Sequence, residues 1–304
     1  MKKSAFILLA ALMLLLCGCK GYRETDSEYI ISAIGFEAAG GGFEVYAEVL
    51  DIETGGNYAE SDVFKCRGET PYEAVDNLVN LLSKMAVFDH CGIAVIADNV
   101  RGTDFKAVID YLYNIRNLNL GVYMYKTASV KELFNCRAQG SCVGYDVMAI
   151  EESVQKTSGV SFKNKYYEML ARLYKNGGFC LPRIGVNDNS PAITGQTVFL
   201  ELEPALNLSE QEATVFNILF SGSSGGEISV AGKRFIVNGI SSDLKPENGG
   251  LLIEVCCQPR FDDDLCRDLE AEAKNLLEKI SGANAASVLG GGDVKNIKVS
   301  VYDK

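Results

Sequence analysis

The sequence predicts an α+β fold, with mixed or antiparallel β-sheets flanked by helices in two to three small domains behind a lipoprotein signal peptide. Three observations lead to this prediction. Short strand-like runs alternate with amphipathic helical patterns over the first two thirds of the chain. The last third holds consecutive strand patterns followed by a long helical pattern. The N-terminus has the basic and then apolar character of an export signal.

The export signal begins with Lys2 and Lys3 and continues as an unbroken apolar run, Ala5–Leu16. This run is shorter than the roughly 20 residues that a membrane-spanning helix needs. It ends in Leu16–Cys19 (LCGC), which resembles the lipobox of bacterial lipoproteins. We therefore expect cleavage before Cys19 and a lipid on its thiol. The alternatives are an ordinary signal peptide with incidental cysteines, or lipidation of Cys17, which would place Leu15 and Leu16 at the cleavage site.

Cleavage at that point would leave 286 residues with 40 acidic and 27 basic side chains, a net charge of −13. Nucleic acids and anionic lipid surfaces both require a basic surface, so this balance argues against either as an electrostatic partner. No later run is apolar for long enough to cross a bilayer. The lipid on Cys19 is therefore expected to hold the protein to the outer face of the membrane, because two acyl chains suffice for stable anchoring.

Eight cysteines follow Cys19, and their even number in an exported protein permits disulfides. Cys136 and Cys142 could close a small loop. Several others, such as Cys91 and Cys256, lie in apolar strand-like runs where a free thiol serves as a small hydrophobic group. We favour mostly free and buried thiols.

The first region starts with predicted strands at residues 28–37, 43–51 and 62–66, the first two joined by a turn at Gly40–Gly42. Thr70 and Pro71 supply an N-cap and an N1 proline for a helix to about Met85. Further elements are then expected in the order strand 92–97, helix 103–115, strand 121–125, helical turns 129–134 and a polar helical region 145–176 ending at Gly177–Gly178.

In the last third, a strand is expected at 192–201, and Ser209 with Glu212 forms a capping-box pattern at the start of a helix. Strands at 227–231, 234–240 and 251–257, a helix at 263–280 and a strand at 294–302 complete the chain. The predicted domains are the signal peptide 1–18, an N-terminal α/β region 19–190 with a possible break near 135, and a C-terminal α+β domain 191–304.

No catalytic arrangement is evident in the sequence. His90 is the only histidine and precedes an apolar strand, where a structural role is expected. Ser221–Gly226 is glycine-rich but follows a helix, which is the wrong context for a phosphate loop. Asp262–Asp264 could bind a hard cation, although capping of the following helix explains it better. Glu151–Glu152 and Glu270–Glu272 are predicted to be solvated, and Tyr166–Tyr167 is predicted to lie in the core.

Five segments carry a resemblance to a known family. They are Ala33–Glu37 (AIGFE), Phe88–Ile96 (FDHCGIAVI), Leu181–Pro182, Gly195–Phe199 (GQTVF) and Leu208–Glu212 (LSEQE). In this order they resemble the C-subunit lipoproteins of the spore germinant receptors, the Ger(x)C family. The chain departs from the family pattern in Lys20–Gly21 after the lipobox, in Arg116–Asn119, and in a compressed segment after Ile280.

The resemblance implies a non-enzymatic subunit of a membrane receptor complex, acting in nutrient-triggered germination by assembly or signal relay. Its implied partners are two integral-membrane subunits, of A- and B-type, and its implied location is the outer leaflet of the spore inner membrane. No cofactor, metal or nucleic acid is expected. The alternative is a lipid-anchored solute-binding protein of a transporter, although the antiparallel last third does not suit its two doubly wound lobes. An envelope hydrolase is disfavoured by the single histidine.

Overall fold

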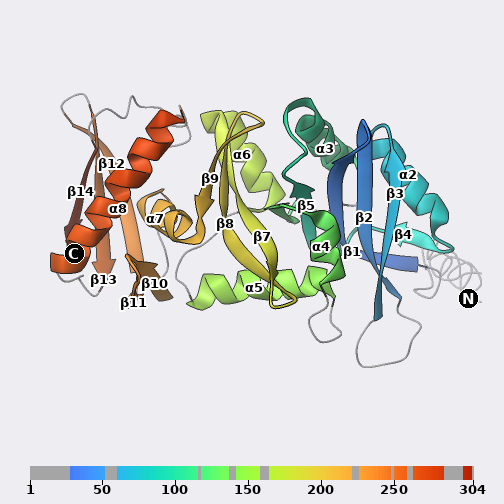
Figure 1. The fold of residues 1–304 in the computed structure, drawn as a ribbon, viewed down its shortest axis with the longest axis horizontal. Helices are drawn as coiled ribbons and strands as arrows, with labels where there is room; N and C mark the ends of the chain where they lie inside the picture. The colour runs from blue at the N-terminus through green and yellow to red at the C-terminus, as the bar shows by residue number, and fades with distance from the viewer. Residues whose placement is uncertain are drawn as a thin grey trace, which may run out of the picture.

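The computed structural model describes residues 28–51, 60–115, 118–136, 142–157, 164–220, 226–237, 239–247, 250–258, 263–283 and 297–302. Within these ranges the molecule is an elongated α+β structure, as the sequence predicts. Figure 1 shows the beginning of the chain and helix α8 at opposite ends of the long axis. No helix among the described residues is long and apolar enough to cross a membrane.

The described strands are β1 (Glu28–Ala39), β2 (Gly42–Asp51), β3 (Glu60–Gly68), β4 (Met85–Val87), β5 (Ile93–Ala97), β6 (Tyr123–Thr127), β7 (Gly178–Asn187), β8 (Ser190–Leu200), β9 (Glu203–Ser209), β10 (Gly226–Val230), β11 (Lys233–Val237), β12 (Gly239–Glu247), β13 (Gly250–Gln258) and β14 (Ile297–Tyr302). The described helices are α2 (Pro71–Leu81), α3 (Gly102–Asn114), α4 (Val130–Asn135), α5 (Val143–Thr157), α6 (Tyr166–Asn176), α7 (Glu210–Phe220) and α8 (Asp263–Gly282).

A large mixed sheet forms the body of the molecule, with the strand order β3-β2-β1-β5-β6-β7-β8-β9 and β4 beside β1. Its central neighbours β1, β5, β6 and β7 are parallel, and β4 is parallel to β1, whereas β2, β3, β8 and β9 pair with their neighbours in antiparallel fashion. Parallel neighbours need crossover connections, and α3 supplies the one between β5 and β6. The parallel centre explains why β1 and β5 are apolar along nearly their whole length.

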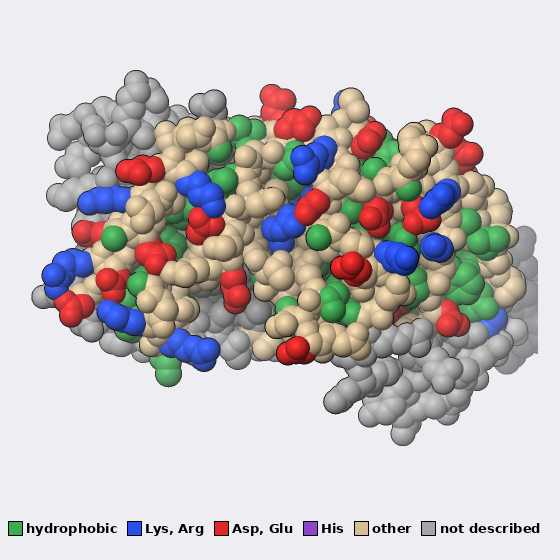
Figure 2. All heavy atoms as spheres, in the orientation of Figure 1, with side chains coloured by type: hydrophobic (Ala, Val, Ile, Leu, Met, Phe, Trp, Pro, Cys, Tyr) green, Lys and Arg blue, Asp and Glu red, His purple; other side chains and the backbone are tan. Residues whose placement is uncertain are grey.

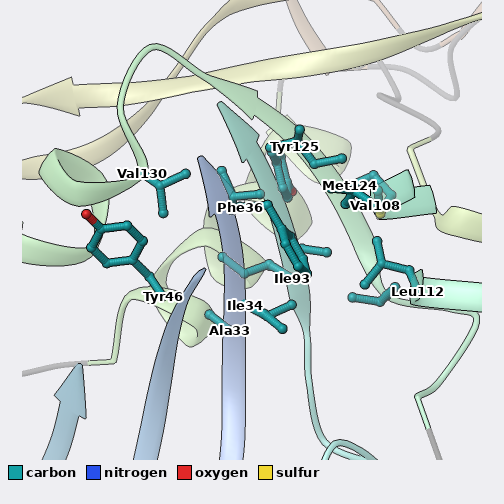
Figure 3. Close-up of a cluster of buried hydrophobic side chains, with 14 of the residues drawn as sticks. Ala33, Ile34, Phe36, Tyr46, Ile93, Val108, Leu112, Met124, Tyr125 and Val130 are labelled. Atoms are coloured by element: carbon teal, nitrogen blue, oxygen red, sulfur yellow. The ribbon is translucent and has the colours of Figure 1, made fainter. Parts of the chain in front are cut away.

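Helices cover both faces of this sheet, and neighbouring residues of β1 show how. Phe36 contacts Tyr111 of α3, with ring centroids 5.8 Å apart. A Cβ at Gly35 would lie 2.3 Å from Val130 of α4, so this helix packs directly on the backbone there. Because successive strand residues point to opposite faces, α3 and α4 lie on opposite sides of the sheet. Figure 3 shows Val108 and Leu112 on one side of β1 and Val130 on the other.

Local signals place several element ends where the sequence predicts them. Gly40 and Gly41 both have positive φ, 61° and 86°, so the β1–β2 turn requires the freedom of glycine. Gly177 ends α6 in the left-handed conformation. The Thr70 side chain caps α2 through the N–H of Glu73. That helix was expected to reach Met85, which was wrong: it ends at Leu81, and Met85 instead starts β4.

The last third contains two small sheets, β10–β11 and β12–β13–β14, packed with α7 and α8. Ser209 and Glu212 form the predicted capping box, with the Ser209 N–H donating to Glu212 at 2.8 Å and the Glu212 N–H donating to Ser209 Oγ at 3.3 Å. Two expectations were wrong here. The strand expected at 234–240 is divided between β11 and β12, and β9 was not foreseen.

Two hydrophobic cores share strands β7 and β8. Phe179 and Phe199 belong to the first core, whereas the adjacent Cys180 and Val198 belong to the second, with α7 and α8. The expected domain boundary after residue 190 falls at the start of β8, which pairs with β7 over residues 178–200. The two cores therefore lie on the two faces of one hairpin. The division into domains stays a prediction.

Among the described residues the free cysteines are Cys66, Cys91, Cys136, Cys142, Cys180, Cys256 and Cys266. All except Cys66 and Cys266 are buried, in agreement with the preference for free thiols. Cys136 and Cys142, the pair considered for a disulfide, each donate a hydrogen bond instead: Cys136 to the Leu133 carbonyl and Cys142 to the Glu48 carboxylate.

Candidate functional site

The predicted lipid-attachment residue, Cys19, lies outside the described residues, as does Asp262. The described chain begins at Glu28, nine residues after Cys19. Cys19 as the site of lipidation therefore stays a prediction.

Four exposed side chains on α3, α6 and the loop before β6 form what we call the tyrosine surface: Tyr113, Leu120, Tyr167 and Tyr174. Tyr113 is 64% exposed and Tyr174 is 86% exposed, and the other two are nearly half exposed. Large exposed side chains are unremarkable when they occur singly. These four differ, because hydrogen bonds join α3, α6 and the loop before β6 to one another and so bring the exposed side chains to one region of the surface.

Tyr166, beneath the exposed side chains, connects α6 to α3. It is buried, as predicted, and its hydroxyl donates to the Ile109 carbonyl of α3 at 2.8 Å. Burial raises the pKa of Tyr166 above its ordinary value, and Asp110, Tyr113 and Tyr174 raise it further by charge interaction. Tyr113 and Tyr174 therefore both lie near the same buried hydroxyl.

The start of α6 is fixed by backbone pairing with the segment before β6. The N–H of Tyr166 donates to the Val122 carbonyl at 2.9 Å, and the N–H of Tyr167 donates to the Leu120 carbonyl at 3.1 Å. Tyr167, which was also predicted to lie in the core, is exposed. Because Tyr174 lies seven residues further along α6, it shares a helix face with Tyr167. The tyrosine surface is thus held on regular, well-packed elements.

A small pocket of about 260 Å³ adjoins this surface. Its lining residues are Asp89, His90, Cys91, Gly92, Asn119, Gly121, Val122, Tyr123, Tyr145 and Met148. Leu120 of the tyrosine surface lies between two of them, Asn119 and Gly121. On the other side, Tyr145 is a half-exposed residue of the first turn of α5. The pocket and the tyrosine surface therefore meet along the segment before β6.

The pocket brings His90 and Cys91 together, but the thiol is not arranged for nucleophilic chemistry. Cys91 is buried, and its Sγ donates to the Ile93 carbonyl at 3.4 Å. Burial raises its pKa to about 12, so the reactive thiolate is not populated near neutral pH. His90 itself is exposed.

The other residues considered from the sequence do not form a ligand site in the described chain. Asp263 begins α8, and Asp264 pairs with Arg267 within that helix. Among the described residues, no three side chains of the metal-ligating types lie together. Of Ser221–Gly226 only Gly226 is described, as the first residue of β10. Glu272 accepts a hydrogen bond from Gln211 of α7 at 2.6 Å, so it links two helices.

The expectation that Glu151 is solvated was wrong. It is fully buried and accepts a hydrogen bond of 3.1 Å from the hydroxyl of Tyr125. Glu152, one position along α5, is exposed as predicted. The helix thus turns its Glu151 side toward β6 and its Glu152 side toward solvent.

Sequence reasoning also missed a buried polar network at the carboxyl ends of β5 and β6. Lys126 is 1% exposed, and its Nζ donates to the carbonyls of Ala97 and Val100. Burial lowers the pKa of Lys126 to about 7. Beside it, Asp98 forms a two-pronged ion pair with Arg183, at 2.7 Å and 2.5 Å. Lys126 thus bonds the chain at the end of β5, and the Asp98–Arg183 pair joins the residue after β5 to β7 across β6, where Lys126 and Arg183 are paired residues.

The N-terminal part of the chain matches a known protein family. Residues 21–186, more than half of its length, match the family model described as the spore germination protein N-terminal domain. No curated protein sequence matches significantly. A solved structure described as "Crystal Structure of the GerBC protein" is similar with 10% sequence identity and a TM-score of 0.40, over 89% of this chain and 96% of that chain.

Proposed function

The chain belongs to the spore germination protein family of germinant receptor C subunits, and from this premise we propose how it acts. The family assigns it a role in spore germination, as part of a membrane-associated receptor complex. We propose that it is a non-enzymatic subunit, anchored by lipid on Cys19 to the outer face of the spore inner membrane. It acts by assembling with, or relaying a signal between, the integral-membrane subunits of A- and B-type.

The tyrosine surface is the observation that supports an assembly role. Tyrosine is enriched in protein interfaces because its ring contributes a large apolar contact and its hydroxyl can still hydrogen-bond. Tyr113, Tyr167 and Tyr174 present three such rings from two helices that are joined through Tyr166. Because helices hold these side chains, the tyrosine surface itself would lose little backbone conformational entropy when a partner binds.

The face drawn in Figure 2 shows no large area of a single charge sign. Figure 2 shows acidic and basic side chains interspersed on the face it draws, with apolar side chains in small separate groups. Such a surface keeps a protein of net negative charge soluble without directing it to a polyanion. The face drawn there gives no support for an interaction through charge, so the assembly role rests on the tyrosine surface.

The second candidate, a lipid-anchored solute-binding protein, is favoured by the pocket beside His90. Its volume of about 260 Å³ lies just below the range of 300–1,000 Å³ that is typical of small-molecule sites. A small polar solute could contact Asp89, His90 and Asn119 there. However, the pocket lies beside one sheet and not between two lobes.

Germination of spores that lack the gene tests the proposal. Complementation should use the wild type, Cys19→Ala, and the triple variant Tyr113→Ser, Tyr167→Ser, Tyr174→Ser. Ile236→Ser is the matched control, since Ile236 is 77% exposed on β11, outside the tyrosine surface. We expect the wild type and the control to restore nutrient-triggered germination, and the other two variants to restore it poorly.

Two further readouts separate the candidates. Every strain should germinate normally with a non-nutrient trigger, because the later steps do not involve the receptor. Copurification of the integral-membrane subunits should be lost in the triple tyrosine variant and kept in Ile236→Ser. If instead copurification is intact and His90→Ala alone abolishes the nutrient response, the solute-binding candidate replaces the assembly role.

A further inference from the structure

The end of the large sheet where the described chain begins has an unusual composition. β4 pairs with the first residues of β1 in parallel, with Met85 opposite Glu28 and Ala86 opposite Tyr29. Helix α2 ends at Leu81, only four residues before β4. The exposed end of α2 and the start of β4 therefore lie beside the point where the chain from Cys19 enters the fold.

This end carries two exposed apolar side chains next to an aromatic residue and a cation. Leu81 is 61% exposed and Met85 is 45% exposed. The Lys84 ammonium lies 5.0 Å from the centroid of the Tyr29 ring. The Tyr29 and Ser83 hydroxyls are 3.2 Å apart and share a hydrogen bond. We call Tyr29, Leu81, Lys84 and Met85 the anchor-proximal end.

The composition matches the boundary of a lipid bilayer. Tyrosine is enriched at the headgroup level, where its ring is apolar and its hydroxyl is hydrated. Lysine can bury its alkyl stem in the same layer while its ammonium stays in water. Exposed leucine and methionine gain free energy there by leaving water. Two exposed apolar residues alone do not indicate a membrane contact. Here a contact is indicated by their place beside the point where the chain from Cys19 enters the fold.

Eight residues lie between Cys19 and Glu28. Fully extended, they span at most about 30 Å, so a lipid on Cys19 keeps this end close to the membrane whatever path the segment takes. The opposite end, with α8, lies far along the molecular axis in Figure 1.

From this we propose that the anchor-proximal end rests on the bilayer and that Leu81 and Met85 insert shallowly among the headgroups and first acyl carbons. The contact is with lipid and is apolar, so it does not require anionic headgroups. The inference depends on the proposed anchoring at Cys19. It places α8 and the last small sheet farthest from the membrane and orients the molecule within the receptor.

The absence of tryptophan from the sequence allows a direct test. A single tryptophan introduced as Leu81→Trp or Met85→Trp would be the only indole in the protein. Ile236→Trp, at a position that is even more exposed and lies near the other end, is the matched control. The lipidated proteins would be placed in phosphatidylcholine vesicles, with and without brominated acyl chains. Circular dichroism would verify that each variant is folded.

We expect the tryptophans at positions 81 and 85 to emit at shorter wavelength in vesicles and to lose fluorescence to the brominated lipid, whereas the one at position 236 does neither. Equal behaviour at all three positions would overturn the proposal. So would quenching that requires phosphatidylserine, or a spectral change that appears only with the integral-membrane subunits, since these outcomes indicate charge or protein contact.

Flotation of the wild type with the vesicles tests the anchor separately. If the wild type does not float, the proposal about Cys19 fails, and a second arrangement still tests the inference. Residues 20–304 with an N-terminal hexahistidine tag would be held on vesicles by a nickel-chelating lipid. The same three tryptophans should then give the same pattern, and their failure to do so would overturn the orientation alone.

Discussion

The carboxylate of Glu48 accepts a hydrogen bond of 2.7 Å from the thiol of Cys142, 94 residues later in the chain. The same carboxylate accepts from the backbone N–H groups of Val143 and Gly144, at 2.7 Å and 2.9 Å, and from Ser32 Oγ at 2.7 Å. Glu48 is buried at 1% exposure. A strand residue thus caps the start of α5, where the helix dipole favours a negative charge.

Glu48→Ala should destabilise the protein strongly, because it leaves several buried donors without an acceptor. We expect a loss of about 2–4 kcal/mol in the free energy of unfolding. Cys142→Ala is the matched control, because it removes one donor and leaves the carboxylate with its other partners. Urea unfolding followed by circular dichroism measures both. A loss for Glu48→Ala no larger than that for Cys142→Ala would contradict this role.

The buried ammonium of Lys126 should make the stability of the protein depend on pH. Its pKa is lowered by burial to about 7 in the folded protein, against about 10.4 when unfolded. Between these values the unfolded chain binds more protons, so stability should rise as the pH rises. From pH 7 to 8.5 the expected gain is about 1.5 kcal/mol. Below pH 7 both states are protonated, and the group adds no further dependence.

Lys126→Met isolates this contribution, since it keeps the apolar stem over Phe105 and removes the ammonium. The pH range should stop near 8.5, because the pKa values of Cys91, Cys142 and Cys180 are all raised to about 12 and their unfolded thiols begin to ionise there. The difference in unfolding free energy between wild type and variant should change with pH in this window. A difference that is constant from pH 7 to 8.5 would refute the assignment.

Local features of this fold could be predicted from the sequence. The capping box at Ser209 and Glu212, the glycine end of α6 at Gly177 and the turn at Gly40 each depend on residues within a few positions. Their chemistry is complete in a short window, so the pattern determines the structure. The free state of the buried cysteines could likewise be inferred from their apolar surroundings.

Features that depend on distant pairing could not be predicted. Glu151 occupies an ordinary helical position, and only the approach of Tyr125 from β6 makes it buried. Lys126 is a charged residue in a short strand, and its burial depends on the carbonyls of the β5 end. The tyrosine surface was missed because Tyr113 and Tyr174 lie 61 residues apart in sequence, on helices that only the fold brings together through the hydrogen bond from Tyr166 to Ile109. Tyr167 shows the reverse, since adjacent tyrosines look alike in sequence but face opposite environments.

The ion pair between Asp98, which follows β5, and Arg183 of β7 should help to hold β7 in place beside β6. Arg183→Lys keeps the charge but loses the two-pronged geometry and the contact with Thr197 Oγ1 at 3.1 Å. We expect the free energy of unfolding to fall by about 1–2 kcal/mol. Both side chains of the pair are largely buried, so Asp98 and Thr197 would be left with fewer hydrogen bonds. Lys65 is the comparison, because its side chain is 57% exposed and its Nζ lies 3.9 Å from Glu44, so Lys65→Ala should change stability little.

A double-mutant cycle with Asp98→Ala and Arg183→Ala measures the coupling directly. A coupling energy above about 0.5 kcal/mol is expected for residues in contact. Additive effects of the two substitutions would mean that the pair does not stabilise the junction between β6 and β7.

The cysteines should differ in reactivity in a way that follows their burial. Cys66 and Cys266 are half-buried, whereas Cys91, Cys142 and Cys180 are buried and have pKa values raised to about 12 by that burial. In native protein at pH 8, iodoacetamide should therefore modify the first two well before the other three, since only the thiolate attacks. Peptide mass spectrometry follows each site, and labelling in urea provides the fully accessible reference. Because the Cys142 thiol donates a hydrogen bond to Glu48, whose charge helps to raise the thiol's pKa, Glu48→Ala should speed its modification more than that of Cys180, which lies in the second core. Recovery of a disulfide-linked peptide joining Cys136 to Cys142, or labelling of Cys142 before Cys66 in the wild type, would show that the Glu48 cap does not hold in solution.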